Sequence, residues 1–536
     1  MPNVQNASDA VYLAADTKLE PLVFRWYAWG HLVSPVQLAL NLAFRHLPML
    51  RSFIANPGVH EAAAKNPKML GGAFLELKQS DVAAVRALQQ DIMQRGAPLL
   101  GFAEELIKFD RQLQKSETGF SLDHLYEALP APLTGLTEVT YDLNNHSSAR
   151  ILEELLYADP LARIAPQEIG FSRIRDDARQ FFINTPRVDG EDRLVIPLPF
   201  DSEHHDLLAS SRIAAVPFDA IAEALGASDP EVRGRLRSYF TETPPQRNQP
   251  EYGGEGVRVR YFGHACVLIQ TAEVSVLIDP FLTWDPDGPE EHLSFHDLPD
   301  RVDYVFLTHN HQDHFCVEFL LQMRNRIGTI LVPRNNPHSL ADPSMKLALR
   351  RLGFDNVLAM DPMDRIALPG GCLVSLPFYG EHADLSISSK HGLFLELKGR
   401  KLLFLADSDC KDRVLYRRIA AQLGKVDTLF IGMECDGAPL TWLYGPYLSN
   451  PINRKDDDSR RLSGSDSEHA WAIAEEFACA TAYVYAMGQE PWLRFVAGLE
   501  YTPQAKQIVE SDKFVSRCHE AGINSRRLYG CCTMML

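Results

Sequence analysis

The spacing of apolar residues in the first half of the chain predicts helices and strands in alternation. Segment 80–95 repeats apolar side chains every three or four residues, which is typical of an amphipathic helix. A second helix is expected to begin at Ser34-Pro35, because serine suits the cap and proline the first turn. Segments 137–143 and 193–198 have the composition of strands. This half is therefore predicted to be a mixed α and β unit.

The second half contains short apolar runs that end in polar residues. The runs 261–269, 274–280, 302–307 and 401–405 have the length of buried strands. An amphipathic helix is expected over 467–477, after a long polar stretch. Alternating strands and helices predict an α/β fold for this half as well.

A segment rich in proline and glycine separates the two halves. Residues 241–256 have no apolar period and are expected to form a linker or a long loop. We therefore predict an N-terminal α/β domain over 1–245 and a second domain over 256–536. A chain of 536 residues is too long for one ordinary core, which agrees with this division.

Composition and charge narrow the class of protein. A hydrophobic content of 46% and a charged content of 23% are typical of a globular protein. The net charge of −17 argues against nucleic acid as a partner, since phosphate binding needs a basic face. No leader pattern and no apolar run of spanning length is evident, so we expect no membrane association and a cytoplasmic protein. The nine cysteines, an odd count without paired spacing, predict free thiols.

The strongest chemical signal follows the run 302–307 directly. His309, His311, Asp313 and His314 form the pattern H-x-H-x-D-H, which places four metal donors within six residues. A single histidine in a polar loop is usually a surface residue, but this spacing after a buried strand is typical of a site for two metal ions.

The surrounding residues resemble the metallo-β-lactamase superfamily. The runs Tyr261–Ile269, with Gly263-His264-Ala265, and 274–280 precede the histidine motif as they do in that superfamily, over roughly residues 256 to 536. The resemblance implies an αββα sandwich. It does not name a reaction, because the superfamily supports many chemistries.

The remaining metal ligands are expected at three further positions. Glu381 and His382 end one apolar run, and neighbouring residues at a strand end point to opposite sides, so one of the two is expected to reach the metal. Asp407 matches the bridging aspartate of the superfamily. His469, at the start of a helix, falls where the resemblance places the last ligand of the second metal.

The whole pattern resembles the di-iron β-hydroxylases of nonribosomal peptide biosynthesis, which have a long N-terminal domain and a glutamate in place of a hydrolase histidine. The resemblance implies one iron bound by His309, His311 and Glu381. It implies a second iron bound by Asp313, His314 and His469, with Asp407 bridging. Such a set, rich in carboxylates, favours iron over zinc.

The function implied is a di-iron monooxygenase that uses O2 to hydroxylate the β-carbon of an amino acid held as a thioester on a nonribosomal peptide synthetase carrier domain. Glu381 and Asp407 would leave room for O2 beside an oxo- or hydroxo-bridged pair of irons. An external electron donor and a homodimer built by the N-terminal domain are also implied. Two acidic partners repel unless a basic patch intervenes, and Arg235-Leu236-Arg237, Arg324-Asn325-Arg326 and Arg350-Arg351 are possible contributors.

Other functions stay open. If His382 is the ligand, the protein is expected to be a di-zinc hydrolase of a lactone, ester or phosphodiester. A metal-bearing protein that mainly binds a partner is a third class. A flavodiiron reductase is disfavoured, because His311 stands where those proteins have glutamate and no flavin or dinucleotide motif occurs.

Overall fold

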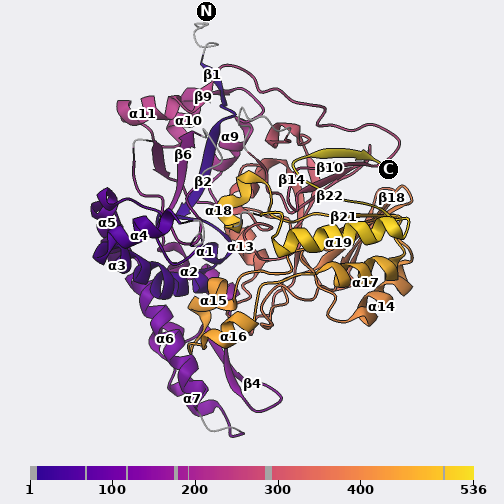
Figure 1. Ribbon diagram of the computed structural model, residues 1–536. Coiled ribbons are helices and arrows are strands. Elements are labelled where there is room, and N and C mark those ends of the chain that lie inside the picture. Colours follow the sequence, from indigo (N-terminus) through magenta and orange to yellow (C-terminus); the bar gives the residue numbers. More distant parts are fainter. Residues whose placement is uncertain are drawn as a thin grey trace, which may run out of the picture.

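The computed structural model describes residues 9–66, 69, 71–115, 119–173, 179–190, 192–283, 292–498 and 501–536, and all statements below concern these residues. Figure 1 shows an N-terminal part that combines small sheets with helices and a C-terminal part that is a layered sandwich. The predicted helix over 80–95 is observed as α5 (Val82–Arg95), and the one at Ser34-Pro35 as α2 (Pro35–Asn41). The α/β fold class is confirmed.

The N-terminal part holds a four-stranded sheet in the order β3-β2-β6-β7, a three-stranded sheet β8-β1-β9 and the hairpin β4-β5. The strands are β1 (Ala10–Leu13), β2 (Thr17–Val23), β3 (Trp26–Tyr27), β4 (Thr137–Tyr141), β5 (Ser147–Ile151), β6 (Gln167–Arg173), β7 (Arg193–Pro197), β8 (Val216–Pro217) and β9 (Phe240–Thr241). The helices are α1 (Gly30–Val33), α2, α3 (Leu47–Ala55), α4 (Pro57–Ala64), α5, α6 (Ala97–Leu113), α7 (Asp123–Glu127), α8 (Glu153–Ala158), α9 (His204–Ser210), α10 (Phe218–Ala224) and α11 (Pro230–Arg237).

The C-terminal part contains two sheets of seven described strands each. The first, in spatial order, is β15 (Val357–Met360), β14 (Ile327–Pro333), β13 (Val302–Phe306), β12 (Ser275–Ile278), β11 (Val267–Gln270), β10 (Arg258–Tyr261) and β23 (Cys532–Met535). The second is β16 (Arg365–Leu368), β17 (Gly371–Leu376), β18 (Gly392–Leu397), β19 (Arg400–Phe404), β20 (Thr428–Ile431), β21 (Thr481–Val484) and β22 (Asn524–Arg527).

Eight described helices belong to the C-terminal part. They are α12 (Val317–Leu321), α13 (Met345–Arg351), α14 (Arg413–Leu423), α15 (Leu440–Tyr444), α16 (Arg454–Ser459), α17 (Ser467–Phe477), α18 (Arg494–Ala497) and α19 (Lys506–Glu520). In Figure 1, α14, α17 and α19 lie together on one side. Their apolar residues share a core with strands of the second sheet, so they form its outer layer.

Three apolar cores hold the layers together. One lies between the two sheets and includes Val259 and Phe306 from the first sheet and Phe404 from the second. The largest joins the N-terminal part to the outer face of the first sheet, because Tyr27 and Leu277 belong to the same buried cluster. The two parts therefore pack against each other through a continuous apolar core. Segment 242–257 contains no described helix or strand, as expected of a connecting loop.

The strand register places the polar residues that follow β12 and β13 at one edge of the sandwich. Ile278 of β12 pairs in parallel with Phe306 of β13, so the residues after both strands emerge side by side. Asp279 and the loop that begins at Leu307 therefore share this edge, which is where ligands usually bind in parallel sheets.

Three further points from the sequence can be compared with the structure. All nine cysteines are free, as predicted. No helix among the described residues is long and apolar enough to cross a membrane. The segment 324–326, named as a possible contributor to a basic patch, does not present its two arginines on the surface, since Arg324 and Arg326 are buried and donate to backbone carbonyls such as Phe200 O and Leu298 O.

Candidate metal centre

The histidine motif forms a tight loop directly after β13. The backbone N–H groups of His314 and Phe315 both donate to the carbonyl of His311, at 3.1 and 2.7 Å. This turn brings His309, His311 and His314 into contact, with ring centroids of His309 and His314 4.1 Å apart. All three imidazoles are buried.

Asp279, directly after β12, holds this loop in place through three contacts. Its carboxylate accepts from the N–H and the hydroxyl of Thr308, at 2.7 and 2.6 Å, and lies 2.8 Å from Nδ1 of His314. In the neutral ring that binds a metal, Nδ1 of His314 donates to Asp279 and Nε2 carries the lone pair that the metal needs. Asp279 is thus an outer partner of a metal ligand.

The structure brings six of the seven predicted ligands together. Three groups of side chains place one donor atom each within 4.8 Å of the others. These groups are His309, His311 and Glu381; His309, His314 and Asp407; and His264, Asp313 and His314. Since the groups share His309 and His314, they describe one continuous centre with room for two ions.

The missing hydrogen bonds of the donor atoms indicate that these atoms can bind metal ions. Nε2 of His309, Nε2 of His314, Oε2 of Glu381 and Oδ1 of Asp407 are buried and have no hydrogen-bond partner. Nε2 of His314 is 3.1 Å from Oδ2 of Asp407, and Nε2 of His309 is 3.6 Å from the same oxygen. Buried polar atoms without partners are costly, so this arrangement indicates cations between them.

The charges of the side chains in the centre also indicate bound metal ions. Burial lowers the pKa of His309 well below its usual range and that of His311 to about 4, so both rings are neutral and able to bind a metal. Burial raises the pKa of Glu381 well above its usual range, and the carboxylates of Asp407 and Asp313 raise it further. Burial opposes protonation of His314, but the carboxylates around it outweigh burial and raise its pKa. The centre has an excess of negative charge that bound cations would offset.

Glu381 and His382 occupy different positions although both are buried. Oε1 of Glu381 lies 2.8 Å from Nδ1 of His311, inside the first group of donors. Nδ1 of His382 lies 2.7 Å from the hydroxyl of Tyr444, and His382 belongs to none of the three groups. The two neighbours therefore point to different partners, as expected, and Glu381 is the one at the centre.

His469 is the predicted ligand that the structure does not bring to the centre. Its Nδ1 lies 2.6 Å from Oδ1 of Asp409, and its side chain is 42% exposed. Asp466 caps the first turn of α17 by accepting from the backbone N–H groups of Glu468 and His469, and the buried Asp409 is the partner of the His469 ring. His469 is therefore not among the candidate donors of the centre, and its assignment as a metal ligand stays a prediction.

Two residues of the site were not predicted. His264 lies in the turn between β10 and β11, with φ of 50°, and its Nε2 is 3.2 Å from Oδ2 of Asp313. Glu434 follows β20, just as Asp407 follows β19. It lines a cavity beside the centre together with His264, Asp313 and Glu381. The apolar run before Glu434 was the available signal, since a strand that ends in a carboxylate had already identified Asp407.

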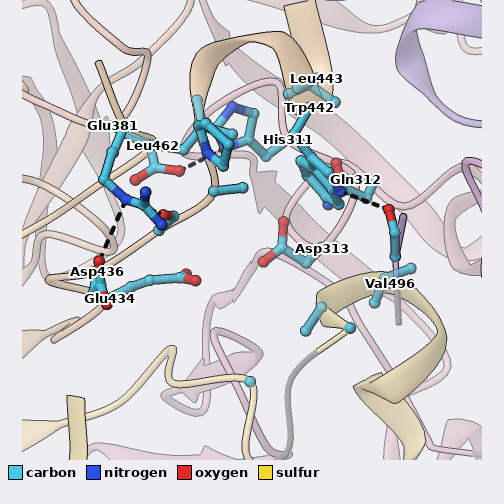
Figure 2. A pocket seen from close by; sticks show the side chains of 18 of the residues that line it. His311, Gln312, Asp313, Glu381, Glu434, Asp436, Trp442, Leu443, Leu462 and Val496 are labelled. Atoms are coloured by element: carbon cyan, nitrogen blue, oxygen red, sulfur yellow. Dashed lines mark hydrogen bonds and ion pairs between the residues drawn. The ribbon is translucent and has the colours of Figure 1, made fainter. Parts of the chain in front are cut away.

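A cavity of about 460 Å³ opens beside these residues. Figure 2 shows His311, Asp313, Glu381 and Glu434 around it, with Trp442 and Leu443 on another wall. Gly71, Gly72 and Phe181 of the N-terminal part also line it. The cavity therefore lies between the two parts of the chain and has one acidic side and one apolar side.

Comparison with known proteins shows to which family this chain belongs. A family model described as the diiron non-heme β-hydroxylase N-terminal domain matches residues 12–244, and one for a β-lactamase superfamily domain matches residues 258–366. The chain is 35% identical over 523 residues to the 4-amino-L-phenylalanyl-(CmlP-peptidyl-carrier-protein) 3-hydroxylase of Streptomyces venezuelae, which covers 96% of this chain and 98% of that protein.

Solved structures agree with the sequence comparison. The crystal structure of CmlA, a diiron β-hydroxylase from Streptomyces venezuelae, matches with a TM-score of 0.91 and 34% identity, over 98% of this chain and 99% of that one. A mutant form of the CmlA β-hydroxylase matches with a TM-score of 0.89 and 34% identity, over 98% of this chain and 100% of that one. With both domains matched along nearly their whole length, the chain belongs to the family of CmlA-like diiron β-hydroxylases.

Proposed function

We propose that this protein hydroxylates the β-carbon of an amino acid that is held as a thioester on a carrier domain of a nonribosomal peptide synthetase. The observation that carries the proposal is the group of His309, His311 and Glu381, joined to Asp407 through shared contacts, within a chain of this family. The relative named above acts on an aminoacyl carrier protein, which supports the same class of substrate here.

The first iron is proposed to be bound by His309, His311 and Glu381, with Asp407 shared between the two ions. Gly432 supports this position of Asp407, because a Cβ at Gly432 would lie 2.9 Å from its Oδ1 and 2.6 Å from the carbonyl of Ala406. A carboxylate in place of a third imidazole makes the donor set harder and favours iron over zinc.

The second iron is proposed to be bound by Asp313 and His314 together with Asp407. The N–H of Gly488 donates to Nδ1 of His264 at 3.1 Å, so the neutral His264 ring carries its proton on Nε2. That nitrogen faces Asp313, and we assign His264 the role of orienting Asp313. Asp436 also lines the cavity but pairs with Arg461 at 3.3 Å, so Glu434 is the carboxylate proposed to complete the second site.

When bound, the irons supply oxidation by O2, a reaction that none of the side chains performs alone. The protein's own contribution is to hold the substrate and exclude water. Phe181, Trp442 and Leu443 offer an apolar wall opposite the acidic side of the cavity. An amino acid delivered on a carrier arm is thereby fixed with one carbon toward the metal ligands, which raises its effective concentration.

Several partners belong to the same proposal. We infer an external electron donor, since hydroxylation with O2 consumes two electrons, and a homodimer built by an N-terminal domain of about residues 1–245 ahead of a catalytic domain over 256–536. A cytoplasmic location is supported by nine free cysteines, which are typical of a reducing compartment.

The test is to load carrier domains with different amino acids and to look for a mass gain of one oxygen atom after incubation with protein, O2 and reductant. We expect about two irons per chain, and product only from a loaded carrier. Equal turnover of a free amino acid would rule out the tethered substrate. Two zincs per chain together with hydrolysis would rule out the oxygenase.

A further inference from the structure

The hydroxyl of Tyr444 lies between two imidazoles next to the metal centre. Its oxygen is 3.0 Å from Nε2 of His311 and 2.7 Å from Nδ1 of His382. All three side chains are buried. No further hydrogen-bond partner of this hydroxyl occurs among the described residues.

The direction of these two hydrogen bonds follows from the chemistry of the groups. His311 faces Glu381 with Nδ1, so this nitrogen must keep its lone pair free to bind a metal. The neutral ring of His311 therefore carries its proton on Nε2 and donates it to the oxygen of Tyr444. The single hydroxyl hydrogen of Tyr444 is then left for Nδ1 of His382.

His382 is thereby held in the form that cannot bind a cation. A neutral imidazole that accepts at Nδ1 carries its proton on Nε2. Nε2 of His382 is buried without a partner, and the ring lies 4.5 Å from that of His311 between centroids. The ring thus lies next to two proposed ligands of the first iron, with centroids 4.5 Å from His311 and 5.7 Å from His309, while its Nδ1 is engaged by Tyr444.

We infer that Tyr444 is a positioning residue that keeps His382 off the first iron and so reserves that position for Glu381. The inference rests on the proposed ligand set of the first iron. It assigns to one buried hydroxyl the choice between the two neighbouring donors at 381 and 382. Through that choice it also sets the preference of the site for iron over zinc, because an imidazole in place of the carboxylate makes the donor set softer.

The test compares Tyr444→Phe with the double variant Tyr444→Phe/His382→Gln. Loss of an outer hydrogen bond is expected to weaken iron binding about tenfold. In Tyr444→Phe, His382 is free to adopt the other tautomer, so we expect a changed visible absorption and a higher ratio of bound zinc to iron. Removing the imidazole in the double variant is expected to restore the wild-type ratio of iron to zinc and the wild-type absorption of the iron-loaded protein, although iron binding stays weaker because His311 still lacks its acceptor. An unchanged spectrum in Tyr444→Phe, or no recovery in the double variant, would overturn the inference.

A matched control is available three residues away. Tyr447 is also buried, but its hydroxyl contacts Nδ1 of His31 and the amide of Asn41. Tyr447→Phe therefore removes the same group without touching His311 or His382, and it is expected to keep the wild-type spectrum. If it changed the spectrum as Tyr444→Phe does, the effect would be a general one of packing, and the assignment to Tyr444 would fail.

The single variant His382→Gln covers the case in which Tyr444→Phe does not fold. We expect it to retain iron content and spectrum, and a loss of iron would show that His382 is a ligand. Failure of the proposed function is a separate outcome, since the wild-type protein would then lack a di-iron spectrum altogether. A wild-type protein that binds two irons beside a Tyr444→Phe variant with the same spectrum would refute only the role of Tyr444.

Discussion

The charges of two buried groups of residues in this protein are compensated in different ways. Where the N-terminal part meets the first sheet, Glu318 pairs with Arg179 at 2.8 Å and accepts from Tyr27, and Glu20 pairs with Arg187 at 3.2 Å. Each carboxylate there has a guanidinium partner. At the metal centre, carboxylates and imidazoles face one another with buried donor atoms unpaired.

The pKa values show the consequence of this difference. Burial alone would raise the pKa of Glu20, but Arg187 and Lys18 outweigh it and hold the pKa well below its usual range. At the centre, burial and the neighbouring carboxylates of Asp407 and Asp313 together raise the pKa of Glu381 well above its usual range. Burial also raises the pKa of Glu318, but Arg179 opposes that rise, whereas the carboxylates around Glu381 add to it. The first group thus has cationic partners within the chain, and the second requires cations from outside the chain.

The largest expected effect is the loss of the shared carboxylate. Asp407→Asn keeps the shape of the side chain but removes the charge that faces both His309 and His314. Since changes to outer partners of metal ligands already cost 10- to 100-fold, we expect hydroxylation to fall by more than about 100-fold. Iron analysis and single-turnover assays would measure it. Two irons per chain in this variant would contradict the comparison.

The next largest effect is expected in the other group. Glu318→Gln removes the buried carboxylate charge that pairs with Arg179, and breaking such a pair costs about 3–5 kcal/mol of unfolding free energy. Thermal or denaturant unfolding would measure the loss. Because Arg179 and Glu318 do not contact the metal centre, iron content per folded chain should stay at the wild-type level, and a parallel loss of iron would show that the two groups are coupled.

Removing the metal should make stability depend on pH in a direction that the pKa values fix. In the metal-free protein the folded pKa values of Glu381 and Glu434 lie above their unfolded values, so the folded state binds more protons and loses stability as the pH rises. Burial lowers the pKa of His309 and His382, and this contributes the opposite slope only below about pH 6.5.

Above about pH 6.5, where the histidines no longer oppose it, we therefore expect the metal-free protein to lose unfolding free energy as the pH rises, while the iron-loaded protein changes little. Unfolding curves at several pH values, with and without chelator, would measure both. A metal-free protein that gains stability over this window would show that the carboxylates are compensated within the chain.

The sequence predicted the part of the site that is contiguous. His309, His311, Asp313 and His314 lie in one loop, so their spacing alone indicated a metal site. Glu381 and Asp407 could be found because each follows an apolar strand. The choice between Glu381 and His382 could not be made from spacing, since it depends on Tyr444, which is more than sixty residues away in sequence.

The residues whose positions the sequence did not reveal share a physical cause. His264 and Glu434 reach the centre through the register of distant strands, which no local pattern reveals. His469 was assigned by its place in the order of ligands, but its helix α17 packs with α14 and α19 on the outer face of the second sheet. Sequence order does not determine on which side of a helix cap a side chain emerges.

The smallest expected effect belongs to His469, and for that reason it sharpens the comparison. His469→Ala removes a hydrogen bond to Asp409 from a side chain that is 42% exposed. Solvent screens this contact, and Lys411 remains beside the same carboxylate at 2.6 Å, so we expect the unfolding free energy to change by less than about 1 kcal/mol. Iron content and the visible spectrum should stay as in the wild type. Loss of one iron in His469→Ala would mean that the helix turns toward the centre when metal binds, and the second site would then need His469 in place of Glu434.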